Sequence, residues 1–157
     1  MKITVFGTGA IGGVMGAFLA RRAQEEGGAE LQVTLVARGE QVAAMRRDGL
    51  RVLWGPAAAS GHAQEPGEEW VVRAGGNVVF ADSGVPAEME AAGPQDYVLS
   101  TLKGHGVALS LDALKPLLAG PDSTFVTLHN GLPFWYWYAG GEGQPGCPAA
   151  FEGQPLP

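Results

Sequence analysis

Cysteine is almost absent from this sequence, with Cys147 the single one among 157 residues. A lone cysteine cannot form a disulfide within its own chain, which favours a reducing compartment. Charged residues are also scarce, at 17%, and acidic residues outnumber basic ones to give a net charge of −6. Nucleic acid and anionic membrane surfaces do not attract such a protein, so neither is expected as a partner.

A targeting or membrane-spanning segment is not expected either. The apolar run at residues 3–20 is interrupted by five glycines, and Lys2 is the only basic residue before it. A signal peptide has a basic start and a small-residue cleavage site, and a membrane span is a longer continuous apolar stretch. The sequence therefore predicts a globular, cytoplasmic protein.

The N-terminal third has the pattern of a βαβ unit. Residues 2–6 form a short apolar run rich in β-branched side chains, as expected of a strand buried on both faces. Residues 31–37 alternate and are rich in β-branched side chains, which predicts a second strand, and a helix ended by Gly27 and Gly28 is predicted between the two strands. Its apolar stripe has the spacing of an amphipathic helix and consists of Ile11, Val14, Met15, Phe18 and Leu19.

The rest of the chain up to residue 138 continues to alternate strands with helices. A helix is predicted at 40–48 and a loop at 55–69. Short strands are predicted at 70–73 and 77–81, and a turn at 74–76 can join them as a hairpin. A strand at 97–102, a helix at 107–118 that Pro116 kinks or ends, and a strand at 124–128 complete the pattern. Such alternation predicts an α/β fold of the Rossmann type, with a doubly wound, mostly parallel sheet and helices on both faces.

Residues 139–157 differ in composition from the rest of the chain. Nine of these 19 residues are Gly or Pro, and only Phe151 and Leu156 are large and apolar. Such a stretch cannot bury enough surface to offset the entropy lost on ordering. We expect one Rossmann domain over residues 1–138, followed by a disordered tail at 139–157.

A G-x-G-x-x-G motif follows the first predicted strand and opens the first predicted helix, which is the context that dinucleotide binding requires. Gly7 permits the tight turn, Gly9 leaves room for a pyrophosphate, and Gly12 lets helix and strand approach closely. The helix N-terminus offers free N–H groups and a partial positive charge to the phosphates. The predicted phosphate-binding residues are Gly7, Thr8, Gly9, Ala10, Ile11 and Gly12.

The residue that closes the second strand indicates which dinucleotide fits. NAD-binding domains usually have Asp or Glu there, which accepts hydrogen bonds from the ribose hydroxyls. This sequence has Arg38 instead. Because a guanidinium fork suits a 2′-phosphate, NADP is favoured over NAD.

Four segments together resemble the 2-dehydropantoate 2-reductase (ketopantoate reductase) family. They are residues 1–5 with the glycine turn, Val36-Ala37-Arg38-Gly39-Glu40, Thr101-Leu102-Lys103 after the Asp96-Tyr97-Val98 strand start, and His129-Asn130-Gly131-Leu132-Pro133 with the aromatic run at 134–138. The resemblance implies NADPH-dependent reduction of the small 2-keto acid ketopantoate to pantoate. It also implies that Lys103 and Asn130 border the nicotinamide and the substrate. Both follow predicted strands, at the edge where open α/β sheets bind ligands.

The resemblance also implies a second, helical domain that supplies the general acid and a substrate-binding acidic residue. Nothing in residues 139–157 corresponds to that domain. We therefore expect the chain to bind the cofactor and to turn over weakly or not at all. His105 and His129 are expected to be incidental loop residues, and no metal ligands are assigned.

Two alternatives stay open on the sequence alone. One is a stand-alone NADP-binding module without catalysis. The other is an interaction protein that forms a homodimer through Trp135 and Trp137, since a large exposed apolar patch usually marks a contact surface.

Overall fold

A computed structural model of the protein describes residues 1–25, 30–55 and 68–130. The helices are α1 (Ala10–Gln24), α2 (Glu40–Asp48), α4 (Pro86–Ala92), α5 (Gly104–Ala108), α6 (Leu111–Leu114) and the short 3₁₀ helix η1 (Pro116–Leu118). The strands are β1 (Lys2–Phe6), β2 (Gln32–Ala37), β3 (Leu50–Trp54), β4 (Glu68–Val72), β5 (Val78–Asp82), β6 (Tyr97–Ser100) and β7 (Thr124–Thr127). The elements predicted at 2–6, 31–37, 40–48 and 124–128 are confirmed to within one residue at each end.

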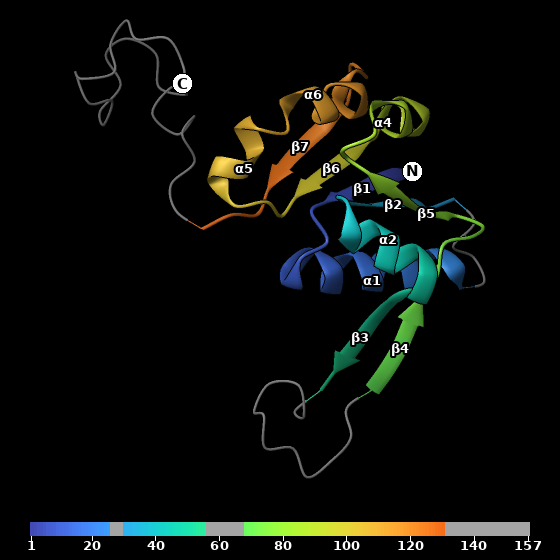
Figure 1. Ribbon diagram of the computed structural model, residues 1–157. Coiled ribbons are helices and arrows are strands. Elements are labelled where there is room, and N and C mark those ends of the chain that lie inside the picture. The colour runs from blue at the N-terminus through green and yellow to red at the C-terminus, as the bar shows by residue number, and fades with distance from the viewer. Residues whose placement is uncertain (26–29, 56–67, 131–157) are drawn as a thin grey trace, which may run out of the picture.

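Five strands form one parallel sheet in the order β5-β2-β1-β6-β7. From β1 the chain builds outward through β2 to β5, then crosses back over β1 to β6 and β7 (Figure 1). This crossover makes the sheet doubly wound and brings the carboxyl ends of all five strands to one edge. The predicted Rossmann-type α/β fold is confirmed.

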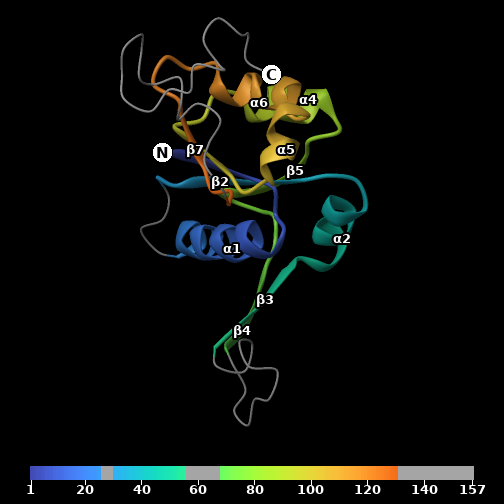
Figure 2. The ribbon, with the colours of Figure 1, turned by 90° about the vertical axis from the view of Figure 1, so that its left-hand side faces the viewer.

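Both faces of this sheet are covered by helices. Val5 and Leu35 belong to a core that includes the buried side of α1, whereas Phe6 and Val36 belong to a second core beneath α4, α5 and α6. Figure 2 shows α1 on one side of the sheet and these three helices on the other. Successive residues of a strand point to opposite faces, so a strand covered on both faces must be apolar throughout.

The face of α1 that packs on the sheet is not the predicted stripe. Its buried residues are all small, namely Gly12, Gly13, Gly16, Ala17, Ala20 and Ala23. The predicted stripe is only partly buried, because Leu19 packs against the core whereas Ile11 is 64% exposed and Phe18 is 41% exposed. A Cβ atom on Gly16 would lie 2.6 Å from Cδ2 of Leu35. The helix therefore approaches the sheet too closely for large side chains between them.

An antiparallel hairpin of β3 and β4 projects beside α1 (Figure 1). β3 was not predicted, and Glu68 and Glu69, assigned to a loop from the sequence, belong to β4. The hairpin predicted across residues 74–76 is wrong, since β4 pairs with β3 while β5 pairs in parallel with β2. Strand pairing depends on partners far along the chain, which local turn residues do not identify.

Aromatic contacts fasten this hairpin to α1. The ring of Phe18 makes edge contacts with Trp54 and Trp70 at centroid distances of 5.1 and 5.2 Å. The guanidinium of Arg21 lies 5.2 Å from the centroid of the Trp70 ring and pairs with Glu68 at 2.6 Å. Phe18 thus packs against the hairpin and not against the sheet, which explains why the apolar stripe is not the sheet-facing side of α1.

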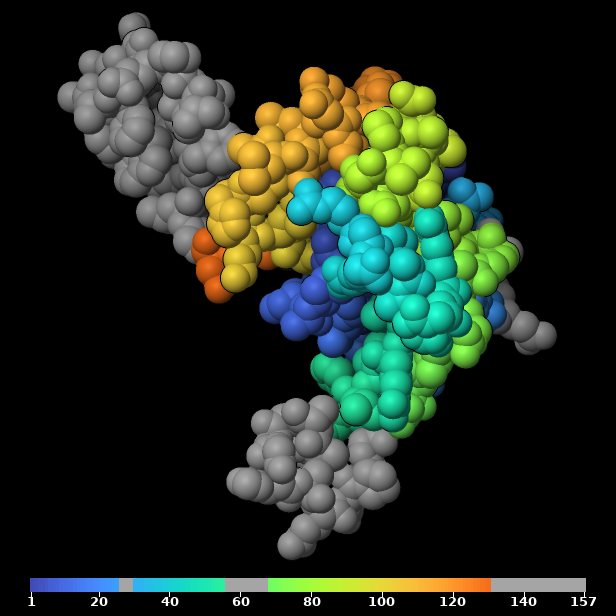
Figure 3. All heavy atoms as spheres, viewed as in Figure 1, coloured from blue at the N-terminus to red at the C-terminus, as the bar shows by residue number. Residues whose placement is uncertain are grey.

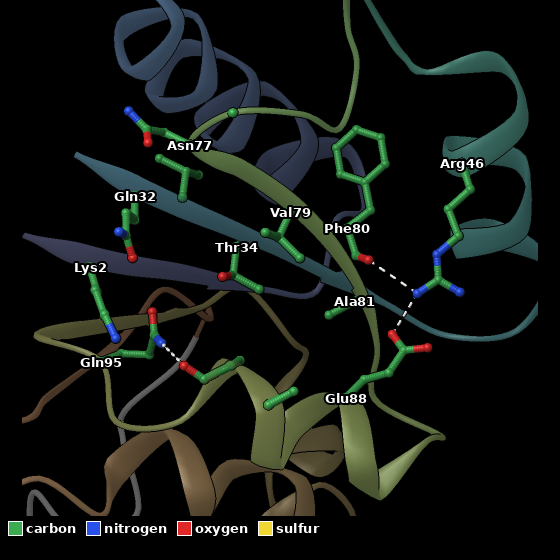
Figure 4. A pocket seen from close by; sticks show the side chains of 14 residues that line it. Lys2, Gln32, Thr34, Arg46, Asn77, Val79, Phe80, Ala81, Glu88 and Gln95 are labelled. Carbon is green, nitrogen blue, oxygen red and sulfur yellow. Dashed lines mark hydrogen bonds and ion pairs between the residues drawn. The ribbon is translucent and has the colours of Figure 1, made fainter. Parts of the chain in front are cut away.

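β5 is an edge strand whose outward polar groups are covered by side chains from two helices. Arg46 of α2 donates to the Phe80 carbonyl at 3.1 Å, and Glu88 of α4 accepts from the Asp82 amide at 2.8 Å. Arg46 and Glu88 pair at 2.5 Å beside a surface pocket of about 520 Å³ (Figure 4). A strand edge occupied in this way is protected against pairing with another chain. The helix α4, which positions Glu88, was not predicted.

The helix predicted at 107–118 is divided into α5, α6 and η1. Its end near Lys115 is confirmed, because Pro116 cannot continue the helix and begins η1 instead. The break between α5 and α6 was not predicted, and it leaves Leu111 53% exposed. The strand predicted at 97–102 ends at Ser100, so residues 101–103 lie in the segment that follows β6 at the carboxyl edge of the sheet.

Several predictions made from the sequence lie outside the described residues. They concern Gly27 and Gly28, Cys147, the aromatic run at 134–138 and the tail at 139–157. Within the described segments, none of the helices is long and apolar enough to cross a membrane.

Candidate functional site

The glycine turn connects the end of β1 to the start of α1 at the carboxyl edge of the sheet. Gly7 has a φ of 104°, a conformation that residues with a side chain rarely adopt. The amides of Gly7 and Thr8 both donate to the carbonyl of Val36, at 2.9 and 3.2 Å. The turn is therefore anchored on β2 as well as on β1.

The other two glycines of the motif meet opposite surroundings. A Cβ atom on Gly12 would clash with the carbonyl oxygen of Gly7 and with Oγ1 of Thr101. A Cβ atom on Gly9 would find nothing within 4 Å. Gly12 is thus required by the packing of the turn, whereas Gly9 faces open space that a ligand can enter.

The start of α1 is suited to an anion. Helix geometry leaves its first N–H groups without intrahelical partners, and no side chain caps them. The first turn contains no acidic residue that would compete with a bound phosphate. The aligned peptides add roughly half a positive charge at this end. The turn can therefore bind a phosphate through its backbone, even though the whole chain is acidic.

A cleft of about 670 Å³ opens in front of this turn. Its lining comes from the glycine turn, from α2 and from the segments after β6 and β7, and consists of Gly7, Thr8, Gly9, Ala10, Ile11, Gly12, Gln41, Thr101, Leu102, Lys103, Gly104, Leu128, His129 and Asn130. Figure 3 shows it as a notch between the start of α1, in blue, and the segments near α5 and the end of β7, in yellow and orange. The structure thus places all six predicted turn residues in one cleft with Lys103 and Asn130.

Lys103 and Asn130 reach the cleft because their strands end beside each other. Lys103 is the N-cap residue of α5 and follows β6, and Asn130 follows β7, the neighbouring strand of the sheet. Both side chains are exposed. Within the described segments Lys103 forms no ion pair, so its ammonium group is available to an anionic ligand.

Arg38 lies outside this cleft, in an adjoining pocket of about 400 Å³. The two hollows share Gly7, Gln41 and Leu102, so a ligand longer than one of them can occupy both. A Cβ atom on Gly84 would lie 3.6 Å from Cγ of Arg38, which places the arginine stem against the loop after β5. Arg38 forms no ion pair within the described residues.

Two residues of the site were missed from the sequence. Nε2 of Gln41, in the first turn of α2, donates to the carbonyl of Thr8, and Oγ1 of Thr101 donates to the carbonyl of Gly7. Thr101 was assigned to the strand predicted at 97–102, which in the structure already ends at Ser100. Gln41 had no local signal, because its partner lies 33 residues away in the sequence.

The two histidines expected to be incidental both border this region. His129 lines the cleft in front of the glycine turn, and His105 lines the pocket of Arg38. Lining a hollow does not assign either histidine a catalytic part, and the expectation that both are incidental stays a prediction. No group of side chains suited to hold a metal ion occurs among the described residues.

The fold and this cleft are those of a Rossmann-type domain, a class in which ligands bind at the carboxyl ends of the strands. The sequence model of the family described as "Ketopantoate reductase PanE/ApbA" matches residues 3–133. The chain belongs to this family.

Known proteins similar to this chain agree with that assignment. A 2-dehydropantoate 2-reductase of Mesorhizobium japonicum is 37% identical over 141 residues, which cover 90% of this chain and 35% of that protein. A Ralstonia solanacearum crystal structure assigned to the ketopantoate reductases is 27% identical, with a TM-score of 0.61 over 86% of this chain and 33% of that one. The 2-dehydropantoate 2-reductase structure from Geobacter metallireducens is 25% identical, with a TM-score of 0.57 over 84% of this chain and 35% of that one. The chain thus spans about a third of the length of these relatives.

The contrast between Gly9 and Gly12 predicts separable effects of one added methyl group. Gly12→Ala should lower the free energy of unfolding by about 1–3 kcal/mol, because the methyl group overpacks the turn. Gly9→Ala should change it by less than about 1 kcal/mol, yet weaken NADPH binding by about tenfold or more. Urea unfolding and fluorescence titration measure the two quantities. Unchanged NADPH affinity in Gly9→Ala would show that the phosphates do not lie over Gly9.

Proposed function

We propose that this chain binds NADPH in the cleft and takes part in reducing 2-dehydropantoate (ketopantoate) to pantoate by hydride transfer. The observation that carries this proposal is that the glycine turn, Lys103 and Asn130 line one cleft at the carboxyl edge of the sheet. The family assignment supports the class of reaction. We assign the NADP-binding domain to residues 1–138, with 139–157 outside it.

The glycine turn is the proposed site of the pyrophosphate. Its uncapped helix start supplies N–H donors, and the open space at Gly9 lets phosphate oxygens come close to the backbone. These two observations meet the steric and electrostatic needs of a dinucleotide. They do not distinguish NADPH from NADH, because the pyrophosphate is common to both.

Arg38 is the proposed determinant of NADP over NAD. It lies at the end of β2, beside the hollow that adjoins the phosphate cleft. A guanidinium can form paired hydrogen bonds with a phosphate and has no competing ion pair among the described residues. The 2′-phosphate of NADPH would therefore find a charged partner that NADH cannot use.

Lys103 and Asn130 are proposed to position the substrate beside the nicotinamide. When bound, NADPH supplies the hydride that reduces the ketone. The ammonium of Lys103 can attract the carboxylate of a 2-keto acid, and the amide of Asn130 can donate to its carbonyl oxygen. Negative charge that develops on that oxygen is stabilised by such fixed donors.

Reduction of a ketone also needs a proton donor for the oxygen. The family resemblance assigns this donor to a helical domain. We propose that residues 1–138 carry the cofactor-binding part of the reaction.

Fluorescence titration tests the cofactor assignment. The wild-type chain should bind NADPH more tightly than NADH, and Arg38→Ala should weaken NADPH by about 10- to 100-fold, since hydrogen bonds to charged groups contribute about 1.5–3 kcal/mol. NADH affinity should stay nearly unchanged. Arg51→Ala removes the same charge from the projecting hairpin and should affect neither ligand. An equal loss of both dinucleotides in Arg38→Ala would contradict the assignment of Arg38.

Oxidation of NADPH in the presence of 2-dehydropantoate tests the catalytic part. We expect a rate close to that of the mixture without protein, because the described cleft contains no assigned general acid. Saturating NADPH binding measured on the same preparation serves as the control for folding. A rate typical of an enzyme, about 1 s⁻¹ or faster, would show that this chain contains its own proton donor.

A further inference from the structure

Gln41 stands at the junction of the two hollows that the proposed dinucleotide would occupy. It lines both the cleft of the glycine turn and the pocket of Arg38. Nε2 of Gln41 donates to the carbonyl of Thr8, in the middle of the turn. The side chain is otherwise exposed, on the first turn of α2. This hydrogen bond therefore links a surface helix to the backbone of the glycine turn.

The peptide between Gly7 and Thr8 shows how a side chain that binds a carbonyl also orients an amide. Oγ1 of Thr101 donates to the carbonyl oxygen of Gly7. The amide of Thr8, which belongs to the same peptide unit, donates to Val36 at 3.2 Å. A trans peptide is planar with its C=O and N–H pointing in opposite directions. A side chain that fixes the carbonyl therefore also fixes the direction of the amide.

Gln41 acts in the same way on the next peptide, between Thr8 and Gly9. Gln41 holds its carbonyl, so the amide of Gly9 points away from Gln41. Within the described segments that amide donates to no protein group, and Gly9 borders open space. The first N–H group of the turn that has no acceptor among the described residues is thus directed by Gln41, which does not belong to the glycine motif.

We propose that Gln41 is a positioning residue that orients the Gly9 amide toward the pyrophosphate of the bound dinucleotide. This inference rests on the proposed function, because it takes the ligand to be a dinucleotide. Gln41 acts on the part that NADPH and NADH share. Its effect therefore differs from that of Arg38, which acts on the 2′-phosphate.

Gln41 is not needed to hold α2 against the turn. Oγ1 of Thr8 already donates to Sδ of Met45, and Met45 is buried in the core with Val42. Loss of the Gln41 amide should therefore leave the fold intact and change the turn alone.

Gln41→Met tests the proposal, since methionine keeps the length of the side chain but removes its donor. The variant should bind NADPH and NADH about three- to tenfold more weakly, by the same factor for both, as expected for one lost hydrogen bond. Gln24→Met is the matched control. Nε2 of Gln24 donates to the carbonyl of Arg73 at 3.0 Å, far from the cleft, so its loss should leave both affinities unchanged.

A spectroscopic measurement separates positioning from a general loss of structure. In ¹H–¹⁵N spectra the Gly9 amide should shift strongly when NADPH is added to the wild-type chain and less in saturated Gln41→Met. Thermal unfolding should show the same melting temperature for Gln41→Met and Gln24→Met. If Gln41→Met does not fold, Gln41→Asn serves instead, because its amide is one methylene too short to reach Thr8.

The outcomes discriminate between the inference and the proposed function. Unchanged affinity in Gln41→Met would overturn the inference, and so would a loss confined to NADPH, which would place Gln41 at the 2′-phosphate. A wild-type chain that binds neither dinucleotide would overturn the proposed function, and the inference with it. Because binding by the wild-type chain is measured without any variant, a failure of the proposed function is distinguishable from a failure of the inference about Gln41.

Discussion

The close approach of α1 to the sheet is the constraint on which the rest of this structure depends. There is no room for a side chain at Gly12, where the helix begins against the carbonyl of Gly7, or at Gly16, where it meets Leu35. The same approach sets the start of α1 at the carboxyl edge of the sheet. The positive end of the helix, the segment with Lys103 and the segment with Asn130 therefore come to line one cleft. One packing condition thus determines both the core and the position of the site.

In the proposed function, the site binds a phosphate mainly through the direction of its backbone amides and only secondarily through charged side chains. The chain has a net charge of −6, so its overall field does not attract a phosphate-bearing ligand. Backbone amides act over a short range and need only the right direction. We infer that side chains outside the glycine motif set this direction, with Thr101 and Gln41 each holding a carbonyl of the turn. In this proposal Arg38 and Lys103 distinguish between ligands that the backbone amides bind equally.

Features with local signals were predicted well from the sequence. The first strand, the helix at 40–48 and the glycine turn all follow from short patterns, and the parallel Rossmann order follows from their alternation. Features that depend on residues far along the chain were not predicted from the sequence. The sheet-facing side of α1 consists of small residues because Leu35 is close, and Phe18 faces a hairpin whose first strand has no clear signal. Gln41 was missed for the same reason, since a single exposed glutamine shows its role only once Thr8 is beside it.

A crystal structure of this chain with NADPH tests the central claim most directly. We expect pyrophosphate oxygens within hydrogen-bonding distance, about 2.7–3.2 Å, of the backbone amides at the start of α1, with the 2′-phosphate near Arg38. NADPH bound elsewhere, or with its pyrophosphate away from the Gly9 amide, would contradict that claim.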